Sequence, residues 1–230
     1  MPRAKIEGVA RTRKRIMTTI DTAAGQISAL IDGPKGTPAL ILGHGAGSGI
    51  RSDFMEFVAS GLAARGLRVT RFNFAYLEAG KKTPDRQPIL EETYSTVVEY
   101  VRRKEQPERL FLGGKSLGGR IASHVVANGV EANGLVFLGY PLHPPGRPDR
   151  LRTAHLNGIS APMLFVEGTR DPFCPLDTLD KVRADLIAPT EVAVIDGGDH
   201  SLRVRKSSGR SSEDTWTEAV EEVADWVERH

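Results

Sequence analysis

The sequence predicts an α/β fold in which a mostly parallel central sheet is covered by helices on both faces. Short apolar runs alternate with amphipathic stretches over most of the 230 residues. Several of these runs are apolar throughout, which is typical of parallel strands that are buried on both sides. Strand–helix alternation implies right-handed crossovers between parallel strands. Since no repeat and no Ser/Gly-rich linker divides the chain, we expect a basic tail over residues 1–14 and a single domain over residues 15–230.

The first elements are expected to be a hairpin, a buried strand, a helix and a further strand. The runs at 15–20 and 26–31 are joined by the turn sequence DTAAG, which indicates the hairpin. ALILG at 39–43 is wholly apolar and predicts a strand covered on both faces. The segment 52–66 has apolar residues at helical spacing, with Ser-Asp at its start and Gly at its end. LRVTRFNF at 67–74 predicts the next strand.

The same alternation continues to the C-terminus. Helices are predicted where apolar residues recur every three or four positions, and strands where short runs are rich in β-branched and aromatic residues. The predicted helices cover residues 90–104, 117–129, 176–187 and 211–230. The predicted strands cover residues 109–114, 134–140, 161–168 and 190–196.

Charge and cysteine content narrow the setting. A formal net charge of +2 is too mild to indicate a nucleic-acid partner, and the basic tail has no interleaved aromatic residues for stacking on bases. The single cysteine, Cys174, excludes an internal disulfide and a thiolate zinc site, and is typical of a reducing compartment. No apolar run approaches the roughly 20 residues of a membrane span, and the start of the chain lacks the apolar stretch of a secretory signal. We therefore expect a cytoplasmic protein without a nucleic-acid or membrane partner.

The glycine-rich sequence LFLGGKSLGGR at 110–120 has two possible interpretations, of which the first is a phosphate-binding loop. That loop requires a glycine five residues before Gly114, where the chain has Arg109 followed by a strand. A dinucleotide fingerprint in GHGAGSG fails as well, because Ser48 or Ser52 stands in the place of its third glycine. Neither nucleotide-binding interpretation is supported.

The second interpretation is the pattern G-x-S-x-G centred on Ser116. A nucleophilic serine of this kind sits on a tight turn between a strand and a helix, and both elements are predicted here. Gly114 and Gly118 stand where side chains would collide across the turn. A glycine-rich turn without chemistry is the alternative, but the context favours Ser116 as a nucleophile.

A nucleophilic serine requires a histidine base and an orienting acid, in the chain order Ser, Asp, His. Asp171 and His200 each follow a buried strand, so both are expected at the carboxyl edge of the sheet beside Ser116. Asp199 is too close to His200 in sequence to reach its ring, and Asp196 is expected to cap a turn. Four other histidines do not follow the last strand and are not expected to be the base: His44, His124, His143 and His155.

The oxyanion of the reaction needs backbone donors that are already in place. We expect one from the N–H of Leu117, at the start of the helix that follows Ser116, where the helix dipole helps. The other is expected from the N–H of Ala46 in HGAGSG, with Gly45 and Gly47 as alternatives. Turn formation alone remains an alternative explanation of this glycine-rich loop.

The segment after the strand that ends at Tyr140 is short and proline-rich, so no lid is expected. The mouth of the site should then be open, walled by Tyr140, Leu142, His143 and the loop FAYLEAG at 74–80, with Gly45 and Gly47 also contacting substrate. An open mouth should favour short acyl groups, because methylenes that stay in water add nothing to binding.

Three arginines near this edge, Arg51, Arg147 and Arg170, are candidates for a preference for anionic substrates, with solvated surface arginines as an equal alternative. Lys115 is a poorer candidate, since its side chain is expected to point opposite to that of Ser116.

The motifs ILGHGAG, GGKSLGGR, GTRDPF and GGDHS together resemble the α/β-hydrolase superfamily over residues 27–229. RFNFAY and GYPLHPPGRP are similar to a small branch without a cap domain that is related to dienelactone hydrolase. The resemblance implies the α/β-hydrolase fold and an acyl hydrolase with Ser116, Asp171 and His200 as its triad. Dienelactone hydrolase itself has a cysteine nucleophile, so dienelactones are not the expected substrate.

These observations predict a serine hydrolase that cleaves a small ester or thioester through an acyl-enzyme. The reaction needs no metal and no organic cofactor, and the expected partner is a small-molecule acyl substrate bound by a monomer or homodimer. An interaction module that keeps the fold without turnover is the alternative, although a complete triad argues against it. A peptidase would call for substrate-gripping structure that the sequence lacks.

Overall fold

The computed structural model describes residues 15–230, so the predicted basic tail at 1–14 lies outside the described residues. The centre of the fold is an eight-stranded sheet in the order β1-β2-β4-β3-β5-β6-β7-β8. The strands are β1 (Ile16–Thr22), β2 (Gly25–Asp32), β3 (Ala39–Gly43), β4 (Arg68–Phe72), β5 (Leu110–Lys115), β6 (Gly134–Leu138), β7 (Met163–Gly168) and β8 (Thr190–Ile195). The hairpin β1–β2 pairs antiparallel with β4, and the remaining neighbours are parallel. The predicted α/β class is confirmed.

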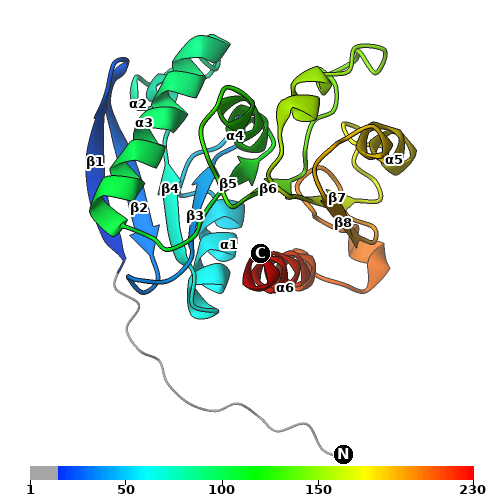
Figure 1. The fold of residues 1–230 in the computed structure, drawn as a ribbon. Helices are drawn as coiled ribbons and strands as arrows, with labels where there is room; N and C mark the ends of the chain where they lie inside the picture. The colour runs from blue at the N-terminus through cyan, green and yellow to red at the C-terminus, as the bar shows by residue number, and fades with distance from the viewer. Residues whose placement is uncertain (1–14) are drawn as a thin grey trace, which may run out of the picture.

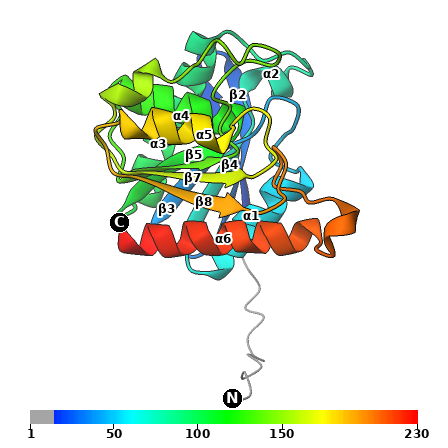
Figure 2. The ribbon, with the colours of Figure 1, turned by 90° about the vertical axis from the view of Figure 1, so that its right-hand side faces the viewer.

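Helices cover both faces of this sheet (Figures 1 and 2). They are α1 (Asp53–Ala64), α2 (Ala75–Glu78), α3 (Gln87–Glu105), α4 (Leu117–Ala127), α5 (Leu176–Ala184) and α6 (Ser212–Arg229), with short 3-10 turns at Ala154–Gly158 and Lys206–Ser208. Figure 2 shows α6 and α1 below the sheet and α3, α4 and α5 above it. Within residues 15–230, no helix has the length and apolar character needed to cross a membrane.

Strand β3 shows why the central runs are apolar throughout. Successive side chains of a strand point to opposite faces, so a strand between two helical layers needs apolar residues at every position. Leu40 and Leu42 pack in the core that contains residues of α1 and α6, whereas Ala39 and Ile41 pack in the core that contains residues of α3 and α4. The sheet therefore separates two hydrophobic cores, and loops follow the carboxyl ends of its parallel strands.

Two helical features differ from the sequence expectation. Helix α3 begins at Gln87 rather than at residue 90, because Pro88 in the first turn needs no backbone hydrogen bond there. Part of the segment expected to be a loop at 74–80 forms the short helix α2. The capped start of the C-terminal helix is confirmed, since Ser211 and Asp214 form a reciprocal capping box.

The turn between β5 and α4 packs closely on the end of β3. A Cβ atom on Gly114 would lie 2.3 Å from the carbonyl oxygen of Gly43, and one on Gly118 would lie 2.1 Å from the same atom. Glycine at both positions therefore lets this turn stand directly against the neighbouring strand. This close approach fixes the position of Ser116, which lies between the two glycines in the turn.

Candidate active site

Ser116 occupies a strained turn at the carboxyl end of β5. Its backbone has φ 51° and ψ −110°, which is unusual for a residue that is not glycine. The backbone N–H of Ser116 donates to the carbonyl of Leu138 at 3.2 Å, and α4 begins at the next residue. The hydroxyl is thereby presented above the sheet, in the strand–turn–helix context that the sequence predicts.

A continuous chain of hydrogen bonds joins Ser116, His200 and Asp171. Oγ of Ser116 lies 2.9 Å from Nε2 of His200, and Nδ1 of His200 lies 2.7 Å from Oδ2 of Asp171. The Asp171 side chain has no exposed surface, and its other oxygen accepts the N–H of Phe173 at 2.8 Å. A carboxylate on Nδ1 selects the tautomer in which Nε2 can accept the serine proton. The structure thus brings the three predicted residues together.

The two competing aspartates are engaged elsewhere. Oδ1 of Asp199 accepts the backbone N–H groups of Ser201 at 2.8 Å and Arg203 at 3.0 Å, which makes it the turn residue expected from the sequence. Asp196 is exposed and lies 3.5 Å from the hydroxyl of Thr169. Neither has a hydrogen bond to the His200 ring.

A second serine–histidine pair, Ser123 and His155, lies beside α4. The hydroxyl of Ser123 is 2.8 Å from Nε2 of His155, but it donates its own proton to the carbonyl of Arg120 at 2.7 Å. Among residues 15–230, no carboxylate pairs with the His155 ring. Burial, with help from His124 and Arg120, lowers the pKa of His155 to about 3. This pair therefore lacks the acid and the free hydroxyl proton that nucleophilic attack requires.

The two expected oxyanion donors both line the pocket that contains Ser116. Within residues 15–230, the backbone N–H groups of Ala46 and Leu117 have no hydrogen-bond acceptor. Leu117 is the first residue of α4, where unpaired N–H groups and the helix dipole favour a negative charge. The arrangement leaves two free donors beside the Ser116 hydroxyl.

Hydrogen bonds from two side chains hold the loop that carries Ala46. The hydroxyl of Tyr76 donates to the carbonyl of Ala46 at 2.9 Å. Nδ1 of the buried His44 lies 2.8 Å from the carbonyl of Gly45, and its Nε2 accepts the N–H of Phe74 at 3.1 Å. Burial lowers the pKa of His44 to about 4, so its ring is neutral near pH 7. His44 is a structural brace, a role that its position after β3 did not predict.

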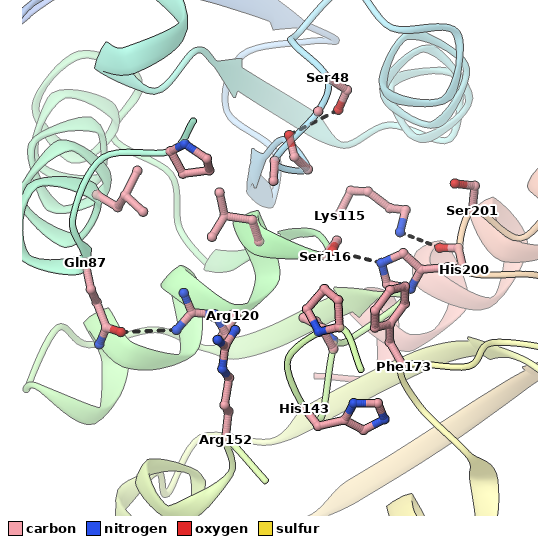
Figure 3. Close-up of a pocket in the computed structure, with 18 of the residues that line it drawn as sticks. Ser48, Gln87, Lys115, Ser116, Arg120, His143, Arg152, Phe173, His200 and Ser201 are labelled. Carbon is pink, nitrogen blue, oxygen red and sulfur yellow. Dashed lines mark hydrogen bonds between the residues drawn. The ribbon is translucent and has the colours of Figure 1, made fainter. Parts of the chain in front are cut away.

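Ser116 and His200 open into a pocket of about 610 Å³ (Figure 3). Three of the predicted substrate-contacting residues, Gly45, Gly47 and His143, line it. His143 is largely buried; its Nδ1 donates to the carbonyl of Pro144 at 2.9 Å, and its Nε2 has no partner within residues 15–230.

The predictions for Tyr140, Leu142 and the segment 74–80 are wrong, because none of them lines the pocket. Tyr140 and Leu142 have no exposed surface and belong to the core above the sheet. Gly139, with φ 68°, turns the chain so that the tyrosine ring returns to the core. The wall expected from residues 74–80 is formed instead by the loop before α3 and its first turn, at 84–90.

Lys115 also differs from its expected position. Its side chain lines the same pocket as Ser116, and its ammonium donates a hydrogen bond to the backbone carbonyl of His200 (Figure 3). The expectation that it points opposite to Ser116 is therefore wrong. Burial lowers the pKa of Lys115 to about 8, although Asp171 and Glu167 act in the opposite direction.

Beneath the site lie an acid and a thiol. Oε1 of Glu167 accepts the N–H of Tyr140 at 2.6 Å, and burial raises the pKa of Glu167 well above its usual range. Burial and Glu167 also raise the pKa of the Cys174 thiol, which disfavours the nucleophilic thiolate. No three His, Cys, Asp or Glu side chains of residues 15–230 are grouped so that they could hold a metal ion.

The arginines at the pocket are not those expected. Arg51, Arg147 and Arg170 are exposed and do not line the pocket. Arg120 and Arg152 line it instead. Arg120 follows Ser116 by four positions, so its place one helical turn away was open to sequence reasoning. Phe173, whose ring centroid lies 4.6 Å from that of His200, was also missed, because nothing in the sequence shows that it covers the histidine.

Comparison with known proteins agrees with this architecture. Residues 36–228 match a family model described as an alpha/beta hydrolase domain. A serine hydrolase homologue from Coxiella burnetii is 21% identical, with a TM-score of 0.69 over 93% of this chain and 96% of the other. Dienelactone hydrolase from Anabaena variabilis is 18% identical, with a TM-score of 0.75 over 96% and 99% of the two chains. A serine hydrolase without a lid from Xanthomonas campestris is 18% identical, with a TM-score of 0.70 over 96% and 98%. At these identities, the solved structures establish similarity of fold.

Proposed function

Because the chain belongs to the alpha/beta hydrolase family, we propose that it is a serine hydrolase that cleaves small carboxylic esters or thioesters through an acyl-enzyme. The observation that carries this proposal is the hydrogen-bond chain from Ser116 through His200 to Asp171. Its two short links join a nucleophile and a base that line one pocket to an orienting acid buried behind them. Similar structures include an esterase domain from Rhodothermus marinus, which is in line with this chemistry.

The reaction follows from the positions of these groups. His200 accepts the proton of Ser116 as Oγ attacks the acyl carbon, and Asp171 stabilises the imidazolium that forms. His200 then gives this proton to the leaving alcohol or thiol as the acyl-enzyme forms. His200 then takes a proton from water as the water oxygen attacks the acyl carbon. The bond from the acyl carbon to Oγ of Ser116 breaks, His200 returns the proton to Oγ, and the acid leaves. Every step uses groups of this chain and water, so the proposal includes no metal and no cofactor.

A negative charge develops on the substrate carbonyl oxygen in each step. We assign the stabilisation of this oxygen to the free N–H groups of Ala46 and Leu117. Tyr76 and His44 hold the loop around Ala46, so its donor is oriented before substrate binds. Pre-positioned donors of this kind contribute much of the rate enhancement in acyl transfer, because they need no reorganisation during the reaction.

The proposed partner is a small-molecule acyl substrate, and a monomer or homodimer in the cytoplasm remains the expected setting. We expect a preference for a short acyl group over a long one. Beyond Ser116 the pocket reaches Gln87 and two arginines, and a long apolar chain would strip water from these polar groups without giving them partners. We therefore expect butyryl esters to be cleaved with higher kcat/KM than octanoyl esters.

The test is hydrolysis of chromogenic acetyl, butyryl and octanoyl esters by the wild type, Ser116→Ala and Ser123→Ala. The proposal expects turnover that Ser116→Ala abolishes and Ser123→Ala retains. A wild type that is no faster than Ser116→Ala on all three esters would favour the interaction module instead. A maximum at octanoyl would contradict the assignment of a short acyl group.

A further inference from the structure

Two guanidinium groups meet at one end of the candidate active site. Arg120 and Arg152 line both the pocket of Ser116 and an adjoining pocket of about 390 Å³. Gln87 also lines both, whereas His124 and His155 line the second pocket alone. In Figure 3 the side chain of Arg152 approaches that of Arg120, which extends from α4. Two cations from separate segments of the chain therefore stand where the active-site pocket and its neighbour share a wall.

These two cations lack anionic partners in the part of the chain that the structure describes. Arg120 donates to Oε1 of Gln87 at 3.2 Å and lies 3.3 Å from Nε2 of His124, and neither arginine forms a salt bridge with a carboxylate within residues 15–230. Burial and the charge of Arg152 lower the pKa of Arg120. Arg120 is half-buried and Arg152 is exposed. Two like charges this close repel each other, and an anion bound between them would relieve the repulsion.

The nearest acids are occupied or stand apart. Glu91 accepts a hydrogen bond from Gln87 at 2.7 Å and another from Asn128 at 3.1 Å. Asp85 lines the active-site pocket and lies 3.9 Å from Nζ of Lys81. The charge of Glu91 acts to raise the pKa of Arg120, but neither carboxylate forms a salt bridge with Arg120 or Arg152 within residues 15–230, so both arginines line the cavity without a direct anionic partner.

The side of the pocket on which the arginines lie decides which part of a substrate they would meet. His200 must protonate the leaving group, so the leaving group lies on the His200 side of Ser116. Figure 3 shows Arg120 and Arg152 on the opposite side of Ser116 from His200. We assign this side to the acyl chain. Arg120 is four residues after Ser116 on α4, which is about 6 Å along the helix axis. The backbone of Arg120 therefore lies about one helical turn from the nucleophile, and its side chain lines the same pocket.

We propose that Arg120 and Arg152 bind a carboxylate at the far end of a short acyl chain. The preferred substrates are then half-esters or half-thioesters of short dicarboxylic acids, of which a succinyl ester is the simplest. This inference rests on the proposed function for the cleavage step, but the subsite itself is a property of the two arginines. Charge-assisted hydrogen bonds from a guanidinium pair to one carboxylate are strong and directional.

The test compares ethyl hydrogen succinate with ethyl butyrate, which differ by a carboxylate in place of a methyl group, by the release of ethanol. The wild type should have a higher kcat/KM for the succinyl ester at low salt, and the advantage should shrink as salt screens the charges. Arg120→Gln and Arg152→Gln should each lower the succinyl-to-butyryl ratio by about tenfold to a hundredfold. Arg150→Gln, which removes an exposed charge from the same loop, should leave the ratio unchanged.

Failure of the subsite and failure of the proposed function give different results. A wild type that cleaves the butyryl ester with a ratio near one, unchanged in Arg120→Gln and Arg152→Gln, overturns the subsite and leaves the hydrolase. If the wild type shows no turnover, the subsite is tested by calorimetric titration of Ser116→Ala with ethyl hydrogen succinate. Binding that Arg152→Gln weakens at least tenfold supports the subsite without hydrolysis, and binding that this substitution leaves unchanged overturns it.

Discussion

The ammonium of Lys115 donates a hydrogen bond to the backbone carbonyl of His200, so the residue before the nucleophile holds the loop that carries the base. This bond crosses from the end of β5 to the loop after β8, and it lies beside the link between Ser116 and the imidazole (Figure 3). Lys115 therefore contributes to the position of His200 even though it takes no part in the proton transfers.

Removal of this amine should change how stability depends on pH. Burial lowers the pKa of Lys115 from 10.5 to about 8 in the folded chain. Between these values the unfolded chain keeps a proton that the folded chain has lost, so the free energy of unfolding rises with pH across this window. Relative to Lys115→Met, the wild type should gain on the order of 3 kcal/mol from pH 8 to 10.5. Urea unfolding of both proteins measures this gain, and parallel pH curves would show that Lys115 does not titrate in this way.

Asp171→Asn should lower kcat for ester hydrolysis by roughly four orders of magnitude, because an amide stabilises the wrong tautomer of His200. The fold should persist, since the amide keeps the size of the carboxylate and can still accept the N–H of Phe173. Asp199→Asn is the matched control, because its carboxylate accepts backbone N–H groups of a turn and does not reach the ring. Larger damage in Asp199→Asn than in Asp171→Asn would refute the assignment of the acid.

Gly118→Ala should destabilise the protein by about 3 kcal/mol or prevent folding, because the new methyl group would lie 2.1 Å from the carbonyl oxygen of Gly43. Gly158→Ala has no heavy atom near its new methyl group and should change stability by less than about 0.5 kcal/mol. Thermal unfolding of the two variants checks this contrast. Equal unfolding temperatures would mean that the close approach of α4 to β3 is not needed.

The order of strands and helices was predictable because each depends on a local pattern. Continuous apolar runs indicated buried parallel strands, and the rule that such strands end at a common edge placed Asp171 and His200 beside Ser116. The same rule could not predict that the Tyr140 side chain is buried in the core. Its position after a strand indicated the pocket, but the positive φ of Gly139 returns its side chain to the core. The conformation of this one turn explains why the prediction for Tyr140 was wrong.

The far end of the pocket depends on contacts between distant segments. Arg120 lies on α4 and Arg152 lies in the segment before the 3-10 turn at 154–158, and their approach depends on how that segment crosses the helix. No periodicity in the sequence reports such a crossing. The sequence analysis named Arg51, Arg147 and Arg170 as candidates for an anionic preference, with solvated surface arginines as an equal alternative, and none of the three lines the pocket.

The most direct test of the account is the site of covalent labelling by a fluorophosphonate probe, measured by the mass of the intact protein and of its peptides. An activated serine reacts far faster than the other hydroxyls of the chain. We expect one adduct on Ser116 in the wild type and in Ser123→Ala, and none in Ser116→Ala. A wild type that stays unlabelled, or an adduct that persists in Ser116→Ala, would contradict the central claim that Ser116 is the nucleophile.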